Sequence, residues 1–123
     1  DLQHMAALVT EHHAEKDAVI FEQGESGEEM FVIVHGEVKV MMQNLKEPEK
    51  EVARRGPGDV VGEMSIISGE PRIASLIAVE DCHFLCFDKK SFAGLLRERP
   101  EVSFAIMRVL CARLEQATKQ QLG

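Results

Sequence analysis

Residues 62–75 read GEMSIISGEPRIAS, and this stretch decides how the rest of the chain is interpreted. Glycines and a proline bracket GEMSIIS, which is long enough for about two turns of helix, with Ser-Gly available to end it. A helix start leaves backbone N–H groups unpaired, so the amides of Met64 and Ser65 are predicted to attract an anion. Arg72 follows on a turn, from which its planar guanidinium can reach back to phosphate oxygens.

The same stretch limits the charge and shape of the ligand. One arginine with a few amides matches a single negative charge, whereas a triphosphate usually takes a P-loop, and the chain contains no GxxxxGK[ST]. Glu63 would repel a neighbouring phosphate unless it accepted a hydrogen bond from the same ligand, as from a ribose 2′-hydroxyl. An anion site beside such an acceptor favours a cyclic nucleotide, whose singly charged phosphodiester lies close to its own ribose. The alternative for Glu63 and Arg72 is an ordinary ion pair on a loop.

Further motifs accompany this segment in a fixed order. Residues 19–40 read VIFEQGESGEEMFVIVHGEVKV, residues 57–59 read PGD, and residues 71–75 read PRIAS. With Gly62-Glu63, this ordered set resembles the cyclic nucleotide-binding domains of the bacterial catabolite activator protein, protein kinase A regulatory subunits and cyclic-nucleotide-gated channels. The resemblance extends over about residues 14–122 and identifies residues 62–75 as the family's phosphate-binding cassette.

The resemblance implies a role for each cassette residue. Glu63 would bind the ribose hydroxyl and Arg72 the phosphate. The other predicted ligand-binding residues, some of which complete the anion site through their amides, are Gly62, Met64, Ser65, Ile73, Ala74, Ser75 and Thr118. Thr118 falls close to where relatives place hydroxyls that meet the adenine amino group.

The residue after the arginine bears on base selectivity. Members that favour cGMP often carry Thr or Ser there, where the hydroxyl reaches the guanine amino group, but this chain has Ile73. The resemblance therefore implies a preference for cAMP, with cGMP as a weaker ligand. No cofactor and no metal are expected.

Apolar periodicity predicts a single α+β domain. Residues 1–13 place apolar side chains at helical spacing and predict an N-terminal helix. Short strands broken by glycines predict an antiparallel β roll over about residues 16–88, like a jelly roll or double-stranded β-helix barrel, with a hairpin turn at His35-Gly36. Two C-terminal helices are predicted over about residues 89–97 and 101–120, separated by a proline.

Composition argues against several other functions. Fourteen Lys and Arg against 21 Asp and Glu give a net charge of −7, which repels a polyanion, so no direct nucleic-acid partner is expected. No apolar run approaches the ~20 residues of a membrane span, and the first residues do not resemble a signal peptide, which predicts a cytoplasmic segment without membrane contact. No GxSxG or HExxH motif occurs, so the domain is predicted to be non-catalytic.

Cysteines and histidines are predicted to have structural or solvated roles. On a strand, Cys82 and Cys86 would share one face while His83 points to the other, so these residues are not expected to converge on a metal. His12 and His13 would lie on the predicted first helix, with solvated side chains.

The predicted helix at residues 101–120 carries a stripe that begins apolar and ends polar: Phe104, Met107, Cys111, Leu114, Thr118 and Gln121. The stripe is explained equally by packing on the β roll and by pairing between two chains. In relatives this helix covers the purine, so the resemblance implies that ligand repositions the C-terminal helices to control an effector, and that a homodimer can form through this helix. The alternative is a docking or dimerisation module of the same fold that binds no nucleotide.

Overall fold

The computed structural model describes residues 10–101, 108 and 111–112. The chain divides into two compact units, Asp1–Lys89 and Lys90–Gly123. The first unit contains the strands and the cassette. The prediction of one domain over all 123 residues stays a prediction.

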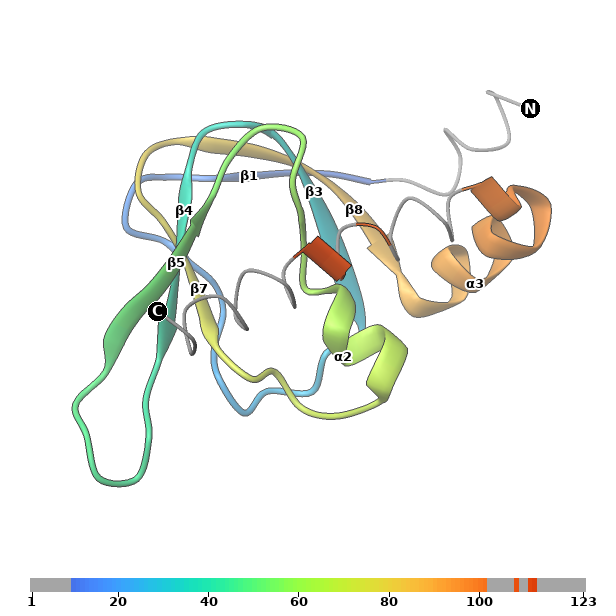
Figure 1. Cartoon of the computed structure of the whole chain (residues 1–123). Coiled ribbons are helices and arrows are strands. Elements are labelled where there is room, and N and C mark those ends of the chain that lie inside the picture. Colours follow the sequence, from blue (N-terminus) through green and yellow to red (C-terminus); the bar gives the residue numbers. More distant parts are fainter. Residues whose placement is uncertain (1–9, 102–107, 109–110, 113–123) are drawn as a thin grey trace. The chain divides into compact units, whose positions relative to one another are not determined.

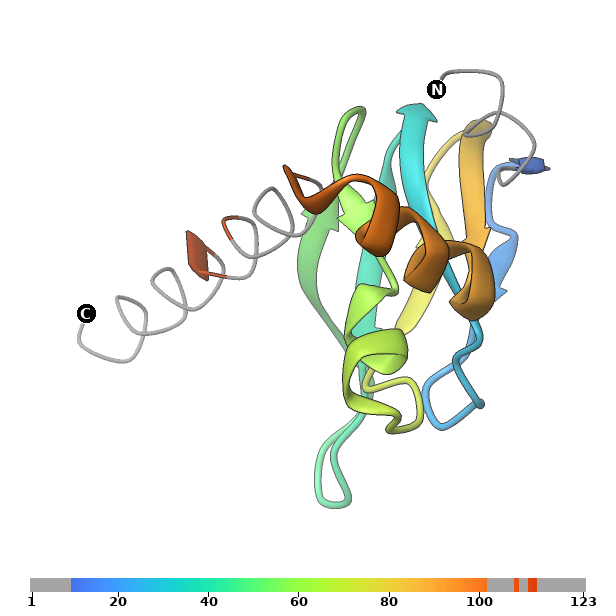
Figure 2. The same cartoon turned by 90° about the vertical axis from the view of Figure 1, so that its right-hand side faces the viewer.

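Two four-stranded antiparallel sheets form the first unit (Figure 1). Sheet A has the strand order β1-β8-β3-β6, and sheet B has the order β2-β7-β4-β5. The strands are β1 Thr10–Ala14, β2 Val19–Phe21, β3 Glu29–His35, β4 Val38–Met42, β5 Lys50–Arg55, β6 Val60–Val61, β7 Ser75–Ala78 and β8 Cys82–Asp88. The predicted antiparallel β roll is confirmed in the form of this two-sheet sandwich. Figure 2 shows β3 and β8 running side by side in sheet A.

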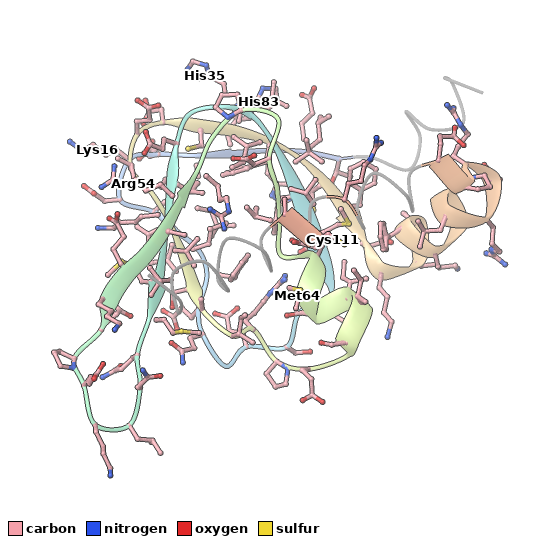
Figure 3. The ribbon with its side chains drawn as sticks, in the orientation of Figure 1. Lys16, His35, Arg54, Met64, His83 and Cys111 are labelled. Carbon is pink, nitrogen blue, oxygen red and sulfur yellow. The ribbon has the colours of Figure 1, made fainter. Side chains whose placement is uncertain are left out.

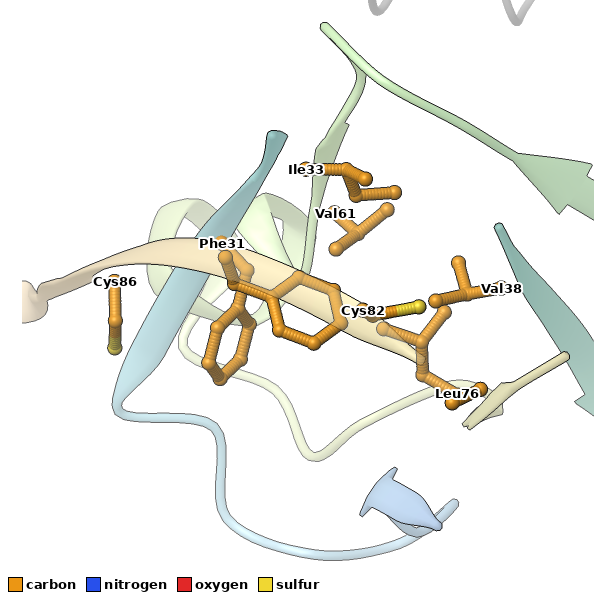
Figure 4. Close-up of a cluster of buried hydrophobic side chains, with 9 residues drawn as sticks. Phe31, Ile33, Val38, Val61, Leu76, Cys82 and Cys86 are labelled. Carbon is orange, nitrogen blue, oxygen red and sulfur yellow. The ribbon is translucent and has the colours of Figure 1, made fainter. Parts of the chain in front are cut away.

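The core lies between the sheets because alternate residues of the strands point inward. In β8, Cys82, Phe84 and Cys86 are buried, whereas the residues between them are less so. The buried cluster draws on both sheets (Figure 4). Its members are Phe31, Ile33, Val38, Val61, Leu76, Ala78, Cys82, Phe84 and Cys86.

The predicted hairpin at His35-Gly36 is wrong. Strand β3 pairs with β8 and β6, whereas β4 pairs with β5 and β7, so the chain passes from sheet A to sheet B at this turn. Gly36 has a φ of 92°, which is suitable both for a hairpin turn within one sheet and for a turn from one sheet to the other. The local sequence therefore does not distinguish these two turns. A Cβ at Gly36 would lie 2.6 Å from both the Asp81 carbonyl oxygen and the Cys82 Sγ, so the corner also needs glycine for space.

The predicted N-terminal helix over residues 1–13 is wrong where the structure describes it. Residues Thr10–Ala14 form β1, which pairs with β8 in the register Thr10↔Cys86 to Ala14↔Cys82. His12 and His13 therefore lie on a strand, and the roll begins at Thr10 rather than near residue 16. The edge of β8 supplies hydrogen bonds that periodicity cannot anticipate. Residues 1–9 lie outside the described part of the chain.

The C-terminal predictions are confirmed in part. Helix α3 spans Lys89–Glu98, close to the predicted 89–97. Within the predicted helix 101–120, residues 101, 108, 111 and 112 are helical, and the remaining positions lie outside the described residues. Among the helices that are described, none is long and apolar enough to cross a membrane.

Core packing gives a direct test of the sandwich. Leu76 on β7 is 2% exposed, whereas Leu45 is fully exposed, so the same substitution probes two environments. We expect Leu76→Ala to lower the free energy of unfolding by about 2–5 kcal/mol, because it leaves a cavity between the sheets. Leu45→Ala should change it by less than about 0.5 kcal/mol. Urea unfolding of both variants measures this, and equal effects would contradict the assigned core.

Candidate functional site

Helix α2, Glu63–Ser68, forms the centre of the cassette, as predicted. It begins after Gly62 and ends at Gly69, which have φ values of 81° and 76° in the left-handed region. Glycine adopts this conformation without the strain that most other residues would have, so the two glycines set the length of the helix. The Gly69 N–H donates to the Ser65 carbonyl at 2.9 Å, which closes the C-terminal end.

The backbone of Arg72 is fastened to the turn that follows β2. The Arg72 N–H donates to the Glu25 carbonyl and the Gly24 N–H donates to the Arg72 carbonyl, both at 2.8 Å. These reciprocal bonds join segments about fifty positions apart in the chain. They fix the point from which the arginine side chain extends, so the turn after α2 is positioned by β2 as well as by the helix.

The guanidinium of Arg72 is buried, with the residue 6% exposed. Its Nη1 donates to the Gly62 carbonyl at 2.8 Å, and its Nη2 donates to the Glu29 carbonyl at 2.6 Å. The Arg72 Cζ lies 4.1 Å from the centre of the Phe21 ring, a cation–π contact. The Nε is buried with no hydrogen-bond partner among the described residues. Because these bonds take two of the five N–H donors, others remain for a ligand.

Electrostatics at Arg72 favour an anion. Burial lowers the pKa of the guanidinium, and the carboxylates of Glu29 and Glu25 act in the opposite direction. The ordinary pKa of arginine is so high that the group stays charged near neutral pH. The carboxylates of Glu29, Glu25 and Glu63 offset part of the cost of burying this cation, and a phosphate that accepts from its spare N–H donors would offset more of it.

Glu63 and Ser65 lie close to this cation. Glu63 is 1% exposed at the first position of α2, and Ser65 is also buried. Neither Glu63 nor Arg72 is the exposed loop group that an ordinary surface ion pair requires. The site therefore holds a carboxylate and a guanidinium that are both withdrawn from water.

Two glycines allow backbone to approach the site closely. A Cβ on Gly62 would lie 2.8 Å from Arg72 Nη1, and a Cβ on Gly27 would lie 2.3 Å from the Ser65 Cβ and 3.0 Å from the Arg72 Cζ. Both distances to side-chain carbons are shorter than ordinary contacts. Gly27 therefore makes room for Ser65 and Arg72 to pack side by side.

The structure separates the predicted site residues into groups. Gly62, Glu63, Ser65 and Arg72 are brought together around the guanidinium. Ala74 and Ser75 are buried, and the Ser75 Oγ accepts a hydrogen bond from the Gln23 N–H at 2.9 Å, so this hydroxyl ties β7 to the turn after β2. The remaining predicted residues are placed differently: Met64 and Ile73 are exposed, and Thr118 lies outside the described residues. Figure 3 shows Met64 on α2.

Sequence reasoning missed Phe21, Gly27 and Glu29 as parts of the site. Phe21 presents its ring to the guanidinium, and Glu29 accepts a hydrogen bond from it through the backbone carbonyl while its carboxylate raises the pKa of Arg72. Every residue has a backbone carbonyl, so no pattern of side chains predicts that the carbonyl of Glu29 accepts a hydrogen bond from Arg72. Gly27, one of three glycines in residues 19–40, gives the one available signal, since a glycine can mark a close approach as well as a turn.

The thiols of Cys82 and Cys86 are buried, as predicted. Cys82 and Cys86 face the core, and burial, together with a hydrogen bond to Glu29, raises the pKa of Cys86 to about 12. The Cys86 Sγ donates to the Glu29 Oε2 at 2.7 Å. A thiol with so high a pKa stays protonated at neutral pH and is a poor nucleophile and metal ligand.

Known proteins share these features. The family model of the cyclic nucleotide-binding domain matches residues 11–99, which include the whole cassette. The chain belongs to the cyclic nucleotide-binding domain family. This membership accounts for the sandwich and for the arrangement of α2 and Arg72 at one site, and it makes the chain a cyclic nucleotide-binding regulatory domain.

Relatives and solved structures agree with this membership. The Cyclic AMP receptor protein of Thermus thermophilus is 34% identical over 98 residues, which are 80% of this chain and 45% of that protein. Human Patatin-like phospholipase domain-containing protein 6 is 30% identical over 112 residues, 89% of this chain and 8% of that protein. The crystal structure of Thermus thermophilus Catabolite Activator Protein has a TM-score of 0.87 at 28% identity, covering 97% of this chain and 56% of that one. The chain thus spans less than half the length of the two curated relatives, the Thermus thermophilus receptor protein and the human phospholipase domain-containing protein.

Gly27 offers a test of the close packing at the site. Gly27→Ala should lower the free energy of unfolding by about 1–3 kcal/mol, because the added methyl group meets Ser65 and Arg72. Gly56→Ala is the matched control, since a Cβ there meets nothing within 4 Å, and it should change stability by less than about 0.5 kcal/mol. Thermal or urea unfolding checks both variants. A Gly27→Ala protein as stable as the control would show that the site is loosely packed.

Proposed function

We propose that this chain is a non-catalytic regulatory domain that binds cAMP in preference to cGMP at the cassette of residues 62–75. The observation that carries the proposal is the buried guanidinium of Arg72. Two backbone carbonyls hold it beside α2, and its Nε has no hydrogen-bond partner among the described residues. A fixed cation with spare donors suits a singly charged phosphodiester. The family membership and the similarity to a protein named Cyclic AMP receptor protein support the same ligand class.

In this proposal Arg72 binds the cyclic phosphate. Its Nε and remaining N–H groups would donate to the phosphate oxygens while Nη1 and Nη2 keep their bonds to Gly62 and Glu29. Because the carbonyls and Phe21 hold the guanidinium in place before the ligand arrives, little side-chain entropy is lost on binding. The amides of Met64, Ser65 and Ala74 would complete the phosphate site, as the resemblance implies.

Glu63 binds the ribose in this proposal. A carboxylate at 1% exposure has lost most of its hydration, so a hydroxyl donor from the ligand would stabilise it. The 2′-hydroxyl of a 3′,5′-cyclic nucleotide is held in the same fused ring system as the phosphate. Arg72 and Glu63 would therefore bind the phosphate and the 2′-hydroxyl of one rigid ligand.

Ile73 supports the choice of cAMP. This residue directly follows the phosphate-binding arginine, is 57% exposed and carries no hydroxyl. A guanine amino group would find no side-chain acceptor there, whereas adenine needs none at this position. The expected discrimination is the energy of one neutral hydrogen bond, about 1 kcal/mol.

Regulation would act through the C-terminal helices, residues 89–97 and 101–120 in the sequence prediction. If Thr118 and its helix contact the purine, the nucleotide has a higher affinity for the arrangement in which that contact is made. Binding would then reposition these helices and control an attached or associated effector, with a homodimer forming through the last helix. Whether ligand activates or inhibits depends on that effector.

Removal of the guanidinium tests the ligand assignment. We expect wild-type protein to bind cAMP more tightly than cGMP, and Arg72→Ala to weaken cAMP binding about a hundredfold, because roughly 3 kcal/mol of charge-assisted hydrogen bonding is lost. Arg54→Ala removes an exposed arginine on β5 and should leave binding unchanged. Calorimetry measures both, and ultraviolet absorbance reports bound purine because the chain lacks Trp and Tyr.

Arg72 also supports the fold, so its charge-preserving variant provides a second measurement. Arg72→Lys should keep the domain folded, as judged by thermal unfolding, and still lose most of the affinity because lysine cannot offer a planar pair of donors. Folded wild-type protein that binds neither nucleotide would overturn the proposal and favour an interaction module of the same fold.

The contact between Glu63 and the ribose can be isolated with a ligand that lacks the hydroxyl. We expect Glu63→Gln to weaken cAMP about tenfold and 2′-deoxy-cAMP hardly at all, because the charge-assisted bond exists only with the hydroxyl present. Glu47→Gln, at an exposed loop position, is the matched control. Calorimetric titration of all three proteins with both ligands completes the cycle. Equal losses for the two ligands would mean that Glu63 does not contact the 2′-hydroxyl.

A further inference from the structure

Three histidines occupy matching positions on adjacent strands of sheet A. His13 on β1 lies opposite His83 on β8, and His35 on β3 lies opposite His83 on its other side. His83 and His35 are found at the same end of the sandwich in Figure 3. Because Cys82 and Phe84 of β8 face the core, His83 points away from it, and the row lies on the outer face of the sheet.

Glu11 belongs to the same outer cluster. It precedes His13 by two positions on β1 and therefore shares its face. The His83 Nε2 lies 3.9 Å from the Glu11 Oε1, and the His13 and His83 rings stack with centroids 4.4 Å apart and planes inclined by 10°. One ligand atom from each of the three residues lies within 4.8 Å of the other two.

The His83 Nε2 has a further property that points to a ligand. This nitrogen is covered from solvent, and it makes no hydrogen bond among the described residues. Its distance of 3.9 Å from the carboxylate oxygen is too long for a hydrogen bond. A buried polar atom without a partner is costly, so a bound ion that it coordinates would stabilise this arrangement.

We propose that Glu11, His13 and His83 form a binding site for a divalent transition metal ion, with Zn²⁺ as the best match. Two imidazole nitrogens and one carboxylate oxygen are the donor types that Zn²⁺ takes, at about 2.0–2.2 Å. Tetrahedral donors at such bond lengths lie roughly 3.3 Å apart. From 3.9 Å, the His83 Nε2 and the Glu11 Oε1 therefore need to approach by about 0.6 Å, and no pair of ligand atoms by more than about 1.5 Å. The stacked rings also need to tilt, and the exposed Glu11 and His13 are free to make these movements.

Three protein ligands leave one tetrahedral position open. His35, the cross-strand neighbour of His83 on the other side, is exposed and is a candidate for it, with water as the alternative. The site would link β1 to β8. Since β1 is one of the two edge strands of sheet A, a bound ion would hold this edge in place.

A second group of potential ligands, His12, Glu29 and Cys86, lies on the opposite face of the same strands. It is less suited to a metal because the Cys86 thiol donates to the Glu29 carboxylate and stays protonated. His12 is therefore a close control: it neighbours His13 in sequence and faces the other way.

The test uses the full 123-residue chain without an affinity tag, treated with a chelator and then titrated with ZnCl₂ by calorimetry. We expect saturable binding of one ion, weakened at least about tenfold by His13→Asn and by His83→Asn, and unchanged by His12→Asn. Wild-type protein without saturation below about 1 mM Zn²⁺ would overturn the site.

Thermal unfolding provides a second readout that does not depend on calorimetry. Zn²⁺ should raise the melting temperature of the wild-type chain and of His12→Asn, and a chelator should reverse the rise, because the ion binds the folded state. His13→Asn should melt at the wild-type temperature in the presence of chelator and show no rise with Zn²⁺. Loss of the rise in His12→Asn but not in His13→Asn would assign the metal to the inner face and contradict the proposal.

Discussion

The buried guanidinium of Arg72 is the constraint on which the candidate nucleotide site depends. It donates to the Gly62 carbonyl at the start of α2 and to the Glu29 carbonyl at the start of β3, and it rests on the Phe21 ring. Strands β2 and β3 thus meet the cassette, some forty to fifty positions later in the chain, at one charged group. The charge is not removed by burial, since arginine stays protonated, so the surroundings must supply acceptors and leave room for an anion.

The sandwich provides the rigid support for this arrangement. Strand β8 illustrates how a single element contributes to two surfaces, because its alternating side chains fill the core on one face and place His83 on the other. The same alternation on β1 puts His12 and His13 on opposite faces. The core, the candidate nucleotide site and the outer histidine cluster can therefore occupy different faces of one small unit without competing for residues.

Predictions from the chain succeeded where the determining interactions are local. The cassette helix follows from glycines at both of its ends, and α3 follows from an apolar period that changes after β8. They failed where pairing between distant strands decides the outcome. Gly36 allows a turn of either kind, and only the preference of β3 for β8 and of β4 for β7 makes it a corner between sheets. Residues Thr10–Ala14 form a strand because their backbone pairs with β8.

The amino-acid sequence alone determined the family and predicted the cassette with Glu63 and Arg72 as its charged groups, since these rest on residue types at short, fixed spacings. Tertiary structure decided what surrounds those groups: the Phe21 ring, the space left by Gly27 and the Glu29 carbonyl. It also decided that His13 meets His83, seventy positions later. Strand register sets such contacts, and a shift of one residue would turn every side chain to the other face. That is why spacing along a single strand could not predict them.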